Sequence, residues 1–95
     1  MLQIAALVWD DWNVGHIARH AVTPSEVEEA CVGEVVAWPT YKGRLLAIGR
    51  TTQGRDLAIV LEPTEAVHAY YVITARPASR RERTAYGDQL ENIKP

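Results

Sequence analysis

Four arginines, residues whose guanidinium groups can bind anions, lie within eight positions of one another in the last quarter of the sequence. Arg76 falls at the end of an expected strand, and Arg80, Arg81 and Arg83 follow Ser79, an expected helix N-cap. Cations are disfavoured in the first turn of a helix because the positive end of the helix dipole lies there. Guanidinium groups and the unpaired N–H groups of a helix start can instead converge on a phosphate. The pattern favours an anion site, with surface ion pairing to Glu82 and other acidic side chains as the alternative.

Candidate acids and bases lie on two expected helices. His16 and His20 are four residues apart on one face of a helix over 14–21, and imidazole titrates near neutral pH. Glu82 and Tyr86 follow on the last helix, where a carboxylate can take a proton and a phenol can donate one. We therefore consider His20 or Glu82 as a base, and Tyr86 or His20 as an acid. Histidines that only form surface hydrogen bonds are the alternative.

The two histidines also have the spacing of a two-histidine metal face. The residue after His16 is Ile17, so the HExxH motif is missing, and no cysteine pair or carboxylate is spaced to complete a site. The sequence therefore predicts no metal and no cofactor. A P-loop, a GxGxxG fingerprint and a Ser-His-Asp order are also missing, which leaves nucleotide hydrolysis and acyl transfer without support.

Three further residues are candidates for RNA binding. Arg50 and Arg55 flank an expected hairpin turn at 52–54, where they would extend the basic surface across the sheet or serve as ordinary hairpin charges. An aromatic side chain near arginines can stack on an unpaired base. Trp9 is the aromatic candidate for this role, although a tryptophan in so small a domain is more often part of the core.

Hydrophobic periodicity and capping signals predict the elements that position these residues. Asn13 is the expected N-cap of the first helix, and Thr23 and Glu26 form the capping box of a second. Strands are expected over 2–8, 34–39, 44–51, 55–62 and 67–76, and the last helix begins at Ser79. The order β-α-α-β-β-β-β-α predicts an α+β domain of two layers, in which an antiparallel sheet meander packs against the helices.

Composition sets the broad class of the chain. Its 95 residues form one domain with a net charge of -2, and they contain no apolar run long enough to cross a membrane. The start MLQIAALVWDDW lacks a positive region before its apolar stretch, so we do not interpret it as a signal peptide. Cys31 is the only cysteine, which excludes an internal disulfide and fits the cytoplasm. Residues 1–33 carry five acidic side chains and one arginine, whereas residues 34–95 carry nine basic and seven acidic ones.

Three segments carry family motifs: WDDWNVGHIARHAVTPSEVEEAC at the start, LLAIGRTTQGRDLAIVLEP in the middle and VITARPASRRERTAY near the end. They resemble, in the same order, the "WD…N…HGV…EE" start, the "IGRSxxGRxLxVV" hairpin and the "I-I-S/T-A-R-x-A-T/S-x-x-E-R-x-x-Y" signature of BrnT-type toxins. These proteins are the toxin half of type II toxin–antitoxin pairs. The resemblance covers about residues 7–87, and the last motif is its most specific part.

The resemblance implies one toxin domain over residues 1–95, with a fold similar to the RelE-like and barnase-like ribonucleases. It implies a metal-free endoribonuclease that cleaves RNA to 2′,3′-cyclic phosphate and 5′-hydroxyl ends and thereby inhibits translation. Arg76 with Arg80 or Arg81 would clamp the phosphate. The family's motif positions correspond here to Trp9, Asp10, His20, Arg50, Arg55, Arg76, Arg81, Glu82, Arg83 and Tyr86.

The resemblance also implies partners. A cognate antitoxin would mask the basic face and repress the shared operon through a DNA-binding part of ribbon-helix-helix type. RNA is the implied substrate, the ribosome a further candidate partner, and a toxin–antitoxin heterotetramer the candidate assembly. The implied location is the cytoplasm, with no membrane partner.

The chain departs from the family pattern at four points. Trp12 and Asn13 stand where many members have a lysine, and Ala21 replaces the glycine after the histidine. Thr84, Gly87 and Asp88 stand where the family has a basic tail after the RRER motif, and the net charge is acidic. These departures favour an alternative function, a catalytically weak or inactive binding module that binds an antitoxin and tunes operon repression. Direct DNA binding ranks last, because no recognition-helix pattern is present.

Overall fold

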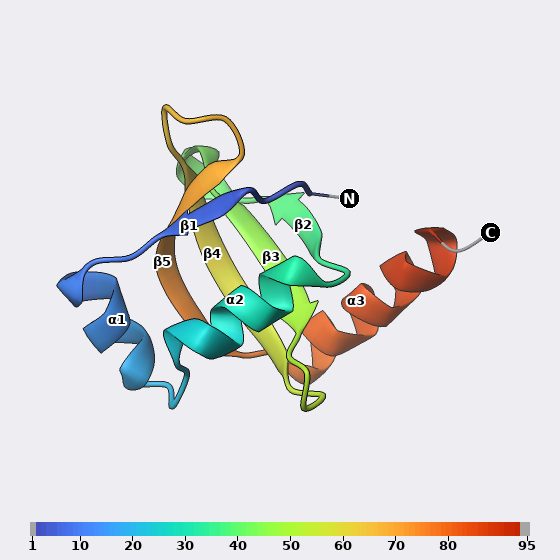
Figure 1. The fold of residues 1–95 in the computed structure, drawn as a ribbon. Helices are drawn as coiled ribbons and strands as arrows, with labels where there is room; N and C mark the ends of the chain where they lie inside the picture. Colours follow the sequence, from blue (N-terminus) through green and yellow to red (C-terminus); the bar gives the residue numbers. More distant parts are fainter. Residues whose placement is uncertain (1, 94–95) are drawn as a thin grey trace.

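Five strands form one mixed sheet in the computed structural model, which describes residues 2–93 (Figure 1). The strands are β1 (Ala6–Val8), β2 (Val36–Pro39), β3 (Leu45–Arg50), β4 (Asp56–Pro63) and β5 (Ala69–Pro77). The helices are α1 (Asp11–Ala18), α2 (Pro24–Val32) and α3 (Arg80–Ile93), and a short 3-10 turn, Tyr41–Gly43, precedes β3. Two helices follow β1, four strands follow those helices, and α3 comes last. The predicted α+β class is confirmed.

The direction of β1 differs from the prediction. Strands β2 to β5 form an antiparallel meander as expected, but β1 lies at the free edge of β5 and runs parallel to it. Ala6 lies opposite Ala69, and Val8 lies opposite Tyr71. The chain then passes through α1 and α2 over one face of the sheet and enters β2 at the far edge (Figure 1). The prediction of an antiparallel sheet is therefore wrong for β1. Apolar periodicity shows which residues face the core, but it gives no information on the direction of a strand.

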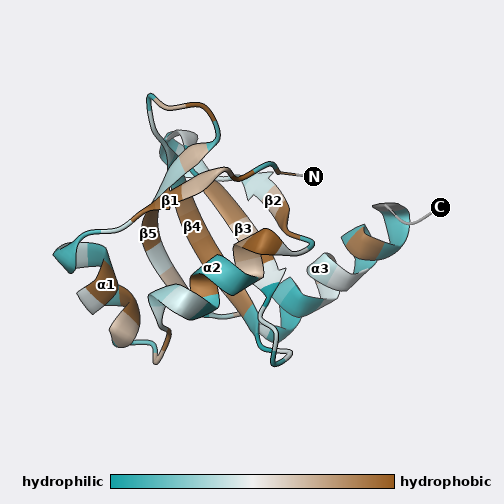
Figure 2. Ribbon diagram, viewed as in Figure 1, coloured by the Kyte–Doolittle hydropathy of each residue, from teal (hydrophilic) through white to brown (hydrophobic). Residues whose placement is uncertain are grey.

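Helices cover both faces of the sheet, so the two-layer prediction was also wrong. Leu57, Ile59 and Leu61 of β4 point to one face, where they pack with buried residues of α1 and α2. Ala58 points to the other face, where it packs with Tyr86 of α3. The alternation of side chains along β4 therefore supplies two separate cores. Figure 2 shows apolar residues along β3, β4 and β5, between the polar parts of the helices.

Helix α1 begins earlier than predicted, because Asp10 and not Asn13 is its N-cap. The Asp10 carboxylate accepts from the Asn13 N–H at 2.9 Å, and the Asn13 side chain accepts from the Asp10 N–H at 2.8 Å. The Asn13 amide is fully buried and also donates to the carbonyls of Val8 and Val72. Asn13 thus fixes α1 to both β1 and β5. Helix α2 has its predicted capping box, formed by Thr23 and Glu26.

A close approach of α2 to the sheet depends on Gly49. A Cβ atom at this position of β3 would overlap the carbonyl oxygen of Ala30. Glycine therefore allows α2 to lie directly on β3. Among residues 2–93, no helix has the length and apolar character needed to cross a bilayer.

Candidate functional site

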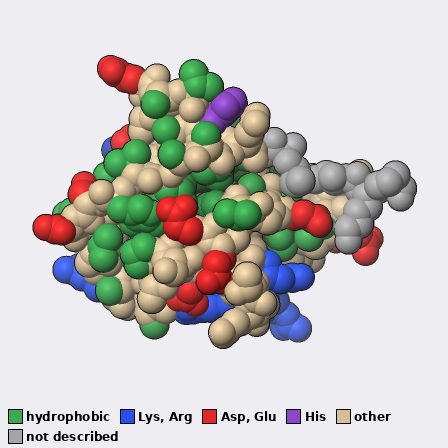
Figure 3. Space-filling model, viewed as in Figure 1, with side chains coloured by type: hydrophobic (Ala, Val, Ile, Leu, Met, Phe, Trp, Pro, Cys, Tyr) green, Lys and Arg blue, Asp and Glu red, His purple; other side chains and the backbone are tan. Residues whose placement is uncertain are grey.

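Five arginines lie on the elements that meet where β3 and β5 end and α3 begins. Arg50 lies opposite Asp56 and Arg76 lies opposite Ala58, so both arginines lie at the same end of the sheet. Ala58 packs in the core beneath α3, which places Arg76 on the α3 face. The arginine cluster consists of Arg50, Arg76, Arg80, Arg81 and Arg83. Figure 3 shows the face of the molecule that α2 covers. Acidic side chains lie over the centre of this α2 face, and basic side chains lie along its lower edge.

Arg76 and Glu82 form a two-pronged ion pair. The Arg76 Nη1 and Nη2 atoms donate to the two carboxylate oxygens of Glu82 at 2.7 and 2.8 Å. Glu82 also accepts from the Ser79 N–H at 2.8 Å, and its own N–H donates to Ser79 Oγ, which completes a capping box. The hydrogen bonds from Arg76 are the main cause that lowers the pKa of Glu82 to about 2. A carboxylate so acidic is a weak base at neutral pH, so the geometry does not support Glu82 as a general base.

Tyr86 is a core residue and not an exposed acid. Its side chain is 2% exposed, and its hydroxyl donates to the carbonyl oxygen of Glu34 at 2.6 Å. Burial is the main cause that raises the pKa of Tyr86. The Arg50 guanidinium lies over the ring at 5.7 Å from its centroid. The phenol therefore anchors α3 to the segment before β2, and the predicted role of Tyr86 as proton donor is not supported.

The remaining arginines of the cluster differ in how far they are neutralised. Arg50 pairs with Asp56 at 2.7 Å, while Arg83 Nη1 donates only to the carbonyl oxygen of Ala78 at 2.9 Å. Arg80 and Arg81 are exposed, and neither forms a side-chain ion pair within residues 2–93. They border a shallow hollow of about 600 Å³ along the exposed side of α3. Three of the five arginines thus lack a carboxylate partner among the described residues.

The histidines lie apart from this cluster. Helix α1 ends at Ala18, so His20 lies in the turn after it. Its ring contacts His16 edge to face at 6.0 Å, and His16 stacks on Trp12 at 4.8 Å. Ile17 fixes α1 to the face opposite α3, and Figure 1 shows α1 and α3 at opposite ends of the view. The structure does not bring His20 to the arginines, so the predicted pairing of this histidine with a phosphate clamp is not supported.

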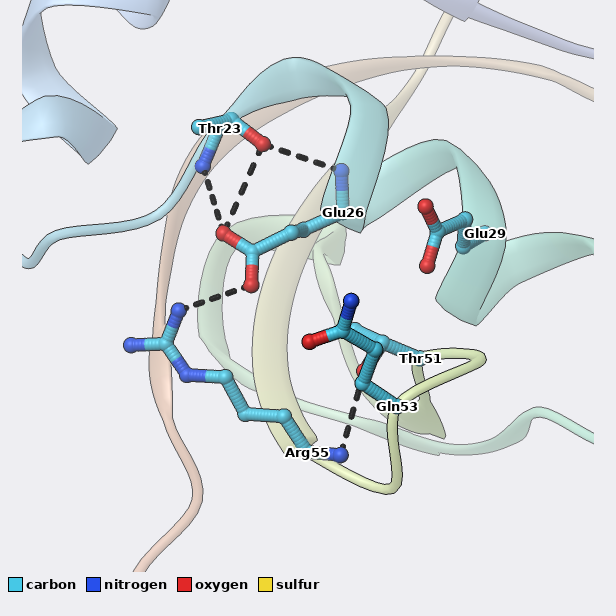
Figure 4. Close-up of a pocket in the computed structure, with 6 residues that line it drawn as sticks. All are labelled: Thr23, Glu26, Glu29, Thr51, Gln53 and Arg55. Atoms are coloured by element: carbon cyan, nitrogen blue, oxygen red, sulfur yellow. Dashed lines mark hydrogen bonds and ion pairs between the residues drawn. The ribbon is translucent and has the colours of Figure 1, made fainter.

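Arg55 and Trp9 form hydrogen bonds within the fold, to α2 and to the turn that precedes it. Arg55 Nη1 donates to Glu26 at 2.9 Å and to the Ala21 carbonyl at 2.8 Å. Figure 4 shows this pair at the edge of a cleft of about 350 Å³ between the start of α2 and the β3–β4 turn. Trp9 Nε1 donates to Glu28 at 3.0 Å, and its ring packs on the core beneath α2. The structure assigns no RNA-facing position to either residue.

Asp10 and Tyr71 have a structural role that the sequence motifs did not predict. The Tyr71 hydroxyl lies 3.0 Å from both carboxylate oxygens of Asp10, so the N-cap of α1 is also tied to β5. Burial and the hydrogen bond to Asp10 raise the pKa of Tyr71. The local signal was present in the sequence, since an aspartate three residues before an asparagine can form a capping box. The Trp-Asp motif near the start of the chain therefore builds the fold here.

No group of three or more His, Cys, Asp or Glu side chains within the described part of the chain could hold a metal ion. In comparisons with known proteins, no family model matches the chain, and no curated protein matches it.

Proposed function

We propose that this chain is a BrnT-like toxin domain of a type II toxin–antitoxin pair, with a RelE-like fold, that acts on RNA in the cytoplasm. The observation that carries the proposal is the arginine cluster, to which β3, β5 and α3 all contribute. RNA carries a phosphate for every nucleotide, and protein cations bind it largely by replacing counterions. The motif resemblance described above supplies the toxin class and the cognate antitoxin.

Arg80, Arg81 and Arg83 are the proposed RNA contacts. Their charges have no carboxylate partner within residues 2–93, and Arg80 and Arg81 are exposed at the start of α3. Guanidinium groups bind phosphate oxygens in two-pronged geometry and stabilise the charge that develops on a phosphate under attack. In this proposal the domain is an endoribonuclease that leaves 2′,3′-cyclic phosphate and 5′-hydroxyl ends, and loss of messenger RNA inhibits translation.

The proposal is tested by controlled expression in a bacterium. Wild type is compared with Arg80→Gln/Arg81→Gln and with Arg19→Gln/Lys42→Gln, which removes the same charge from exposed positions outside the cluster. We expect growth arrest and newly formed 5′-hydroxyl RNA ends with wild type and with the control, and neither with Arg80→Gln/Arg81→Gln. Arrest that is equal for all three proteins would contradict the role of the cluster.

A second candidate function is a catalytically inactive toxin-like module that binds an antitoxin and tunes operon repression. One observation favours it: Glu82 and Tyr86 are engaged within the fold, and His20 follows α1, a helix that packs on the sheet face opposite α3. A metal-free ribonuclease needs a base for the 2′-hydroxyl and an acid for the leaving oxygen. The described residues do not bring such a pair to the cluster.

The two candidates are separated by co-expression with any small open reading frame that adjoins this gene. An active toxin arrests growth alone, and the neighbouring product relieves the arrest. An inactive module leaves growth and RNA intact, but copurifies with the neighbouring product in a complex such as a heterotetramer. Failure of both arrest and copurification would contradict both candidates. Adding purified ribosomes to the RNA cleavage assay then tests whether an active toxin requires them.

A further inference from the structure

Glu82 supplies the arginine cluster with an anion from the chain itself. Its carboxylate receives two hydrogen bonds from Arg76 and one from the Ser79 N–H, at 2.7, 2.8 and 2.8 Å. Two oxygens of a phosphate would accept hydrogen bonds from the same kinds of donor, namely a planar guanidinium and a backbone N–H at the start of a helix. The position that the sequence predicts for a phosphate is therefore filled by a side chain.

The Arg76–Glu82 contact is two-pronged and partly buried, which distinguishes it from an ordinary exposed surface pair. The Glu82 side chain is 17% exposed and the Arg76 side chain 42% exposed, so solvent screens the contact only partly. Both hydrogen bonds from Arg76 have near-ideal length, and a third, from the Ser79 N–H, holds the Glu82 carboxylate in position. The charge of Arg76 is consequently neutralised next to Arg80, Arg81 and Arg83.

We propose that Glu82 is an intramolecular anion that withholds Arg76 from RNA and thereby limits the affinity of the arginine cluster. The proposal rests on the proposed RNA binding, because it describes the regulation of the same surface. In the resting protein, RNA contacts Arg80, Arg81 and Arg83. Arg76 becomes a phosphate contact only when the charge of Glu82 is removed.

The variant that tests this contact is Glu82→Gln. Glutamine at this position still accepts from the Ser79 N–H, so the capping box survives while the charge is lost. The matched control is Glu65→Gln, which makes the same change in an exposed loop between β4 and β5. Binding of poly(U) is measured by fluorescence anisotropy over a series of KCl concentrations, and each protein is first checked for a cooperative thermal transition.

We expect Glu82→Gln to bind poly(U) several-fold more tightly than both wild type and Glu65→Gln. One added phosphate contact makes the slope of log K against log salt steeper by about 0.7 for a single strand. The gain should disappear when Arg76→Gln is added to Glu82→Gln, because the released arginine is its source. The same set is repeated with Gly87→Ala, which raises the helix propensity of α3, so that a folding defect cannot hide the result.

Three outcomes would overturn the inference. If Glu82→Gln and Glu65→Gln bind alike, the contact does not limit affinity. If the gain survives the addition of Arg76→Gln, it arises from general charge and not from a released arginine. If wild type fails to bind poly(U), and Arg80→Gln/Arg81→Gln behaves in the same way, the proposed RNA function fails and this inference fails with it. Binding by wild type with no response to Glu82→Gln leaves the proposed function standing alone.

Discussion

Arg50 lies over the ring of Tyr86, with its guanidinium carbon 5.7 Å from the ring centroid, while it pairs with Asp56. The Tyr86 hydroxyl at the far end of the same ring donates to the Glu34 carbonyl. One side chain thus connects a surface cation to the core beneath α3. The position of the arginine cluster depends on this packing, because α3 carries three of its five members.

Replacing Tyr86 with phenylalanine separates its structural role from a chemical one. The ring and its contact with Arg50 would stay, but the Glu34 carbonyl would lose its hydrogen bond. We expect the free energy of unfolding to fall by about 1 kcal/mol. Chemical denaturation measures this loss, and growth arrest on expression should be unchanged. A strong loss of arrest in a fully folded variant would instead make the phenol a chemical participant.

Replacing Arg76 with alanine should destabilise the domain. Glu82 would lose both prongs of its ion pair, and the start of α3 would lose its link to β5. Hydrogen bonds to charged groups contribute more than neutral ones, so we expect a loss of about 1–2 kcal/mol. For a domain of this size, each kcal/mol lowers the melting temperature by about 4–8 °C. Arg80→Ala is the control and should leave the melting temperature nearly unchanged, because the Arg80 side chain forms no ion pair within residues 2–93.

The pKa of Glu82 predicts how stability depends on pH. In the folded chain this pKa is about 2, below its ordinary value of 4.5 in the unfolded chain. The unfolded chain therefore binds the proton first as the pH falls, and the folded state loses stability between these two values. Above pH 4.5 the contribution of Glu82 is fully present. Urea unfolding at several pH values measures the slope, and Glu82→Gln should make it shallower while Glu65→Gln, at an exposed loop position, should change it less.

Two glycines should respond in opposite ways to alanine. At Gly49 the new Cβ would overlap the Ala30 carbonyl and push α2 from the sheet, at a cost of about 1–3 kcal/mol. At Gly87, within α3, the new Cβ would meet no atom within 4 Å outside its own stretch of helix, and alanine should stabilise the helix by about 1 kcal/mol. Melting temperatures of the two variants test this contrast. A neutral Gly49→Ala would mean that α2 can shift without loss.

Local signals in the sequence predicted some elements well and others poorly. The capping box of Thr23 and Glu26 acts within four residues, so the start of α2 was readable from the sequence. The start of α1 was missed although its Asp10–Asn13 capping box is equally local, and the sequence did not show that Asn13 also donates to Val72, 59 residues away. The direction of β1 and the covering of both sheet faces likewise depend on contacts between distant segments.

In the candidate site too, the features set by neighbouring residues were predictable, whereas those set by distant contacts were not. The neighbourhood of Arg76 and Arg80 was predictable, because a strand end and a helix start four residues apart must be close. Pairing with Glu82 was the alternative to a phosphate site, and the structure shows this pair for Arg76. The sequence did not show that Glu82 would serve both the N-cap and Arg76 at once. His20 was wrongly grouped with the arginines, since the sequence does not reveal which face of the sheet a helix covers.

The parallel pairing of β1 with β5 has a consequence for synthesis on the ribosome. Residues 6–8 are made about 60 residues before their strand partner, residues 69–71. Helix α3, which carries most of the arginine cluster, is made later still. Neither the closed sheet nor the cluster can form before β5 and the start of α3 have emerged. A nascent chain that lacks these segments therefore cannot present the complete surface.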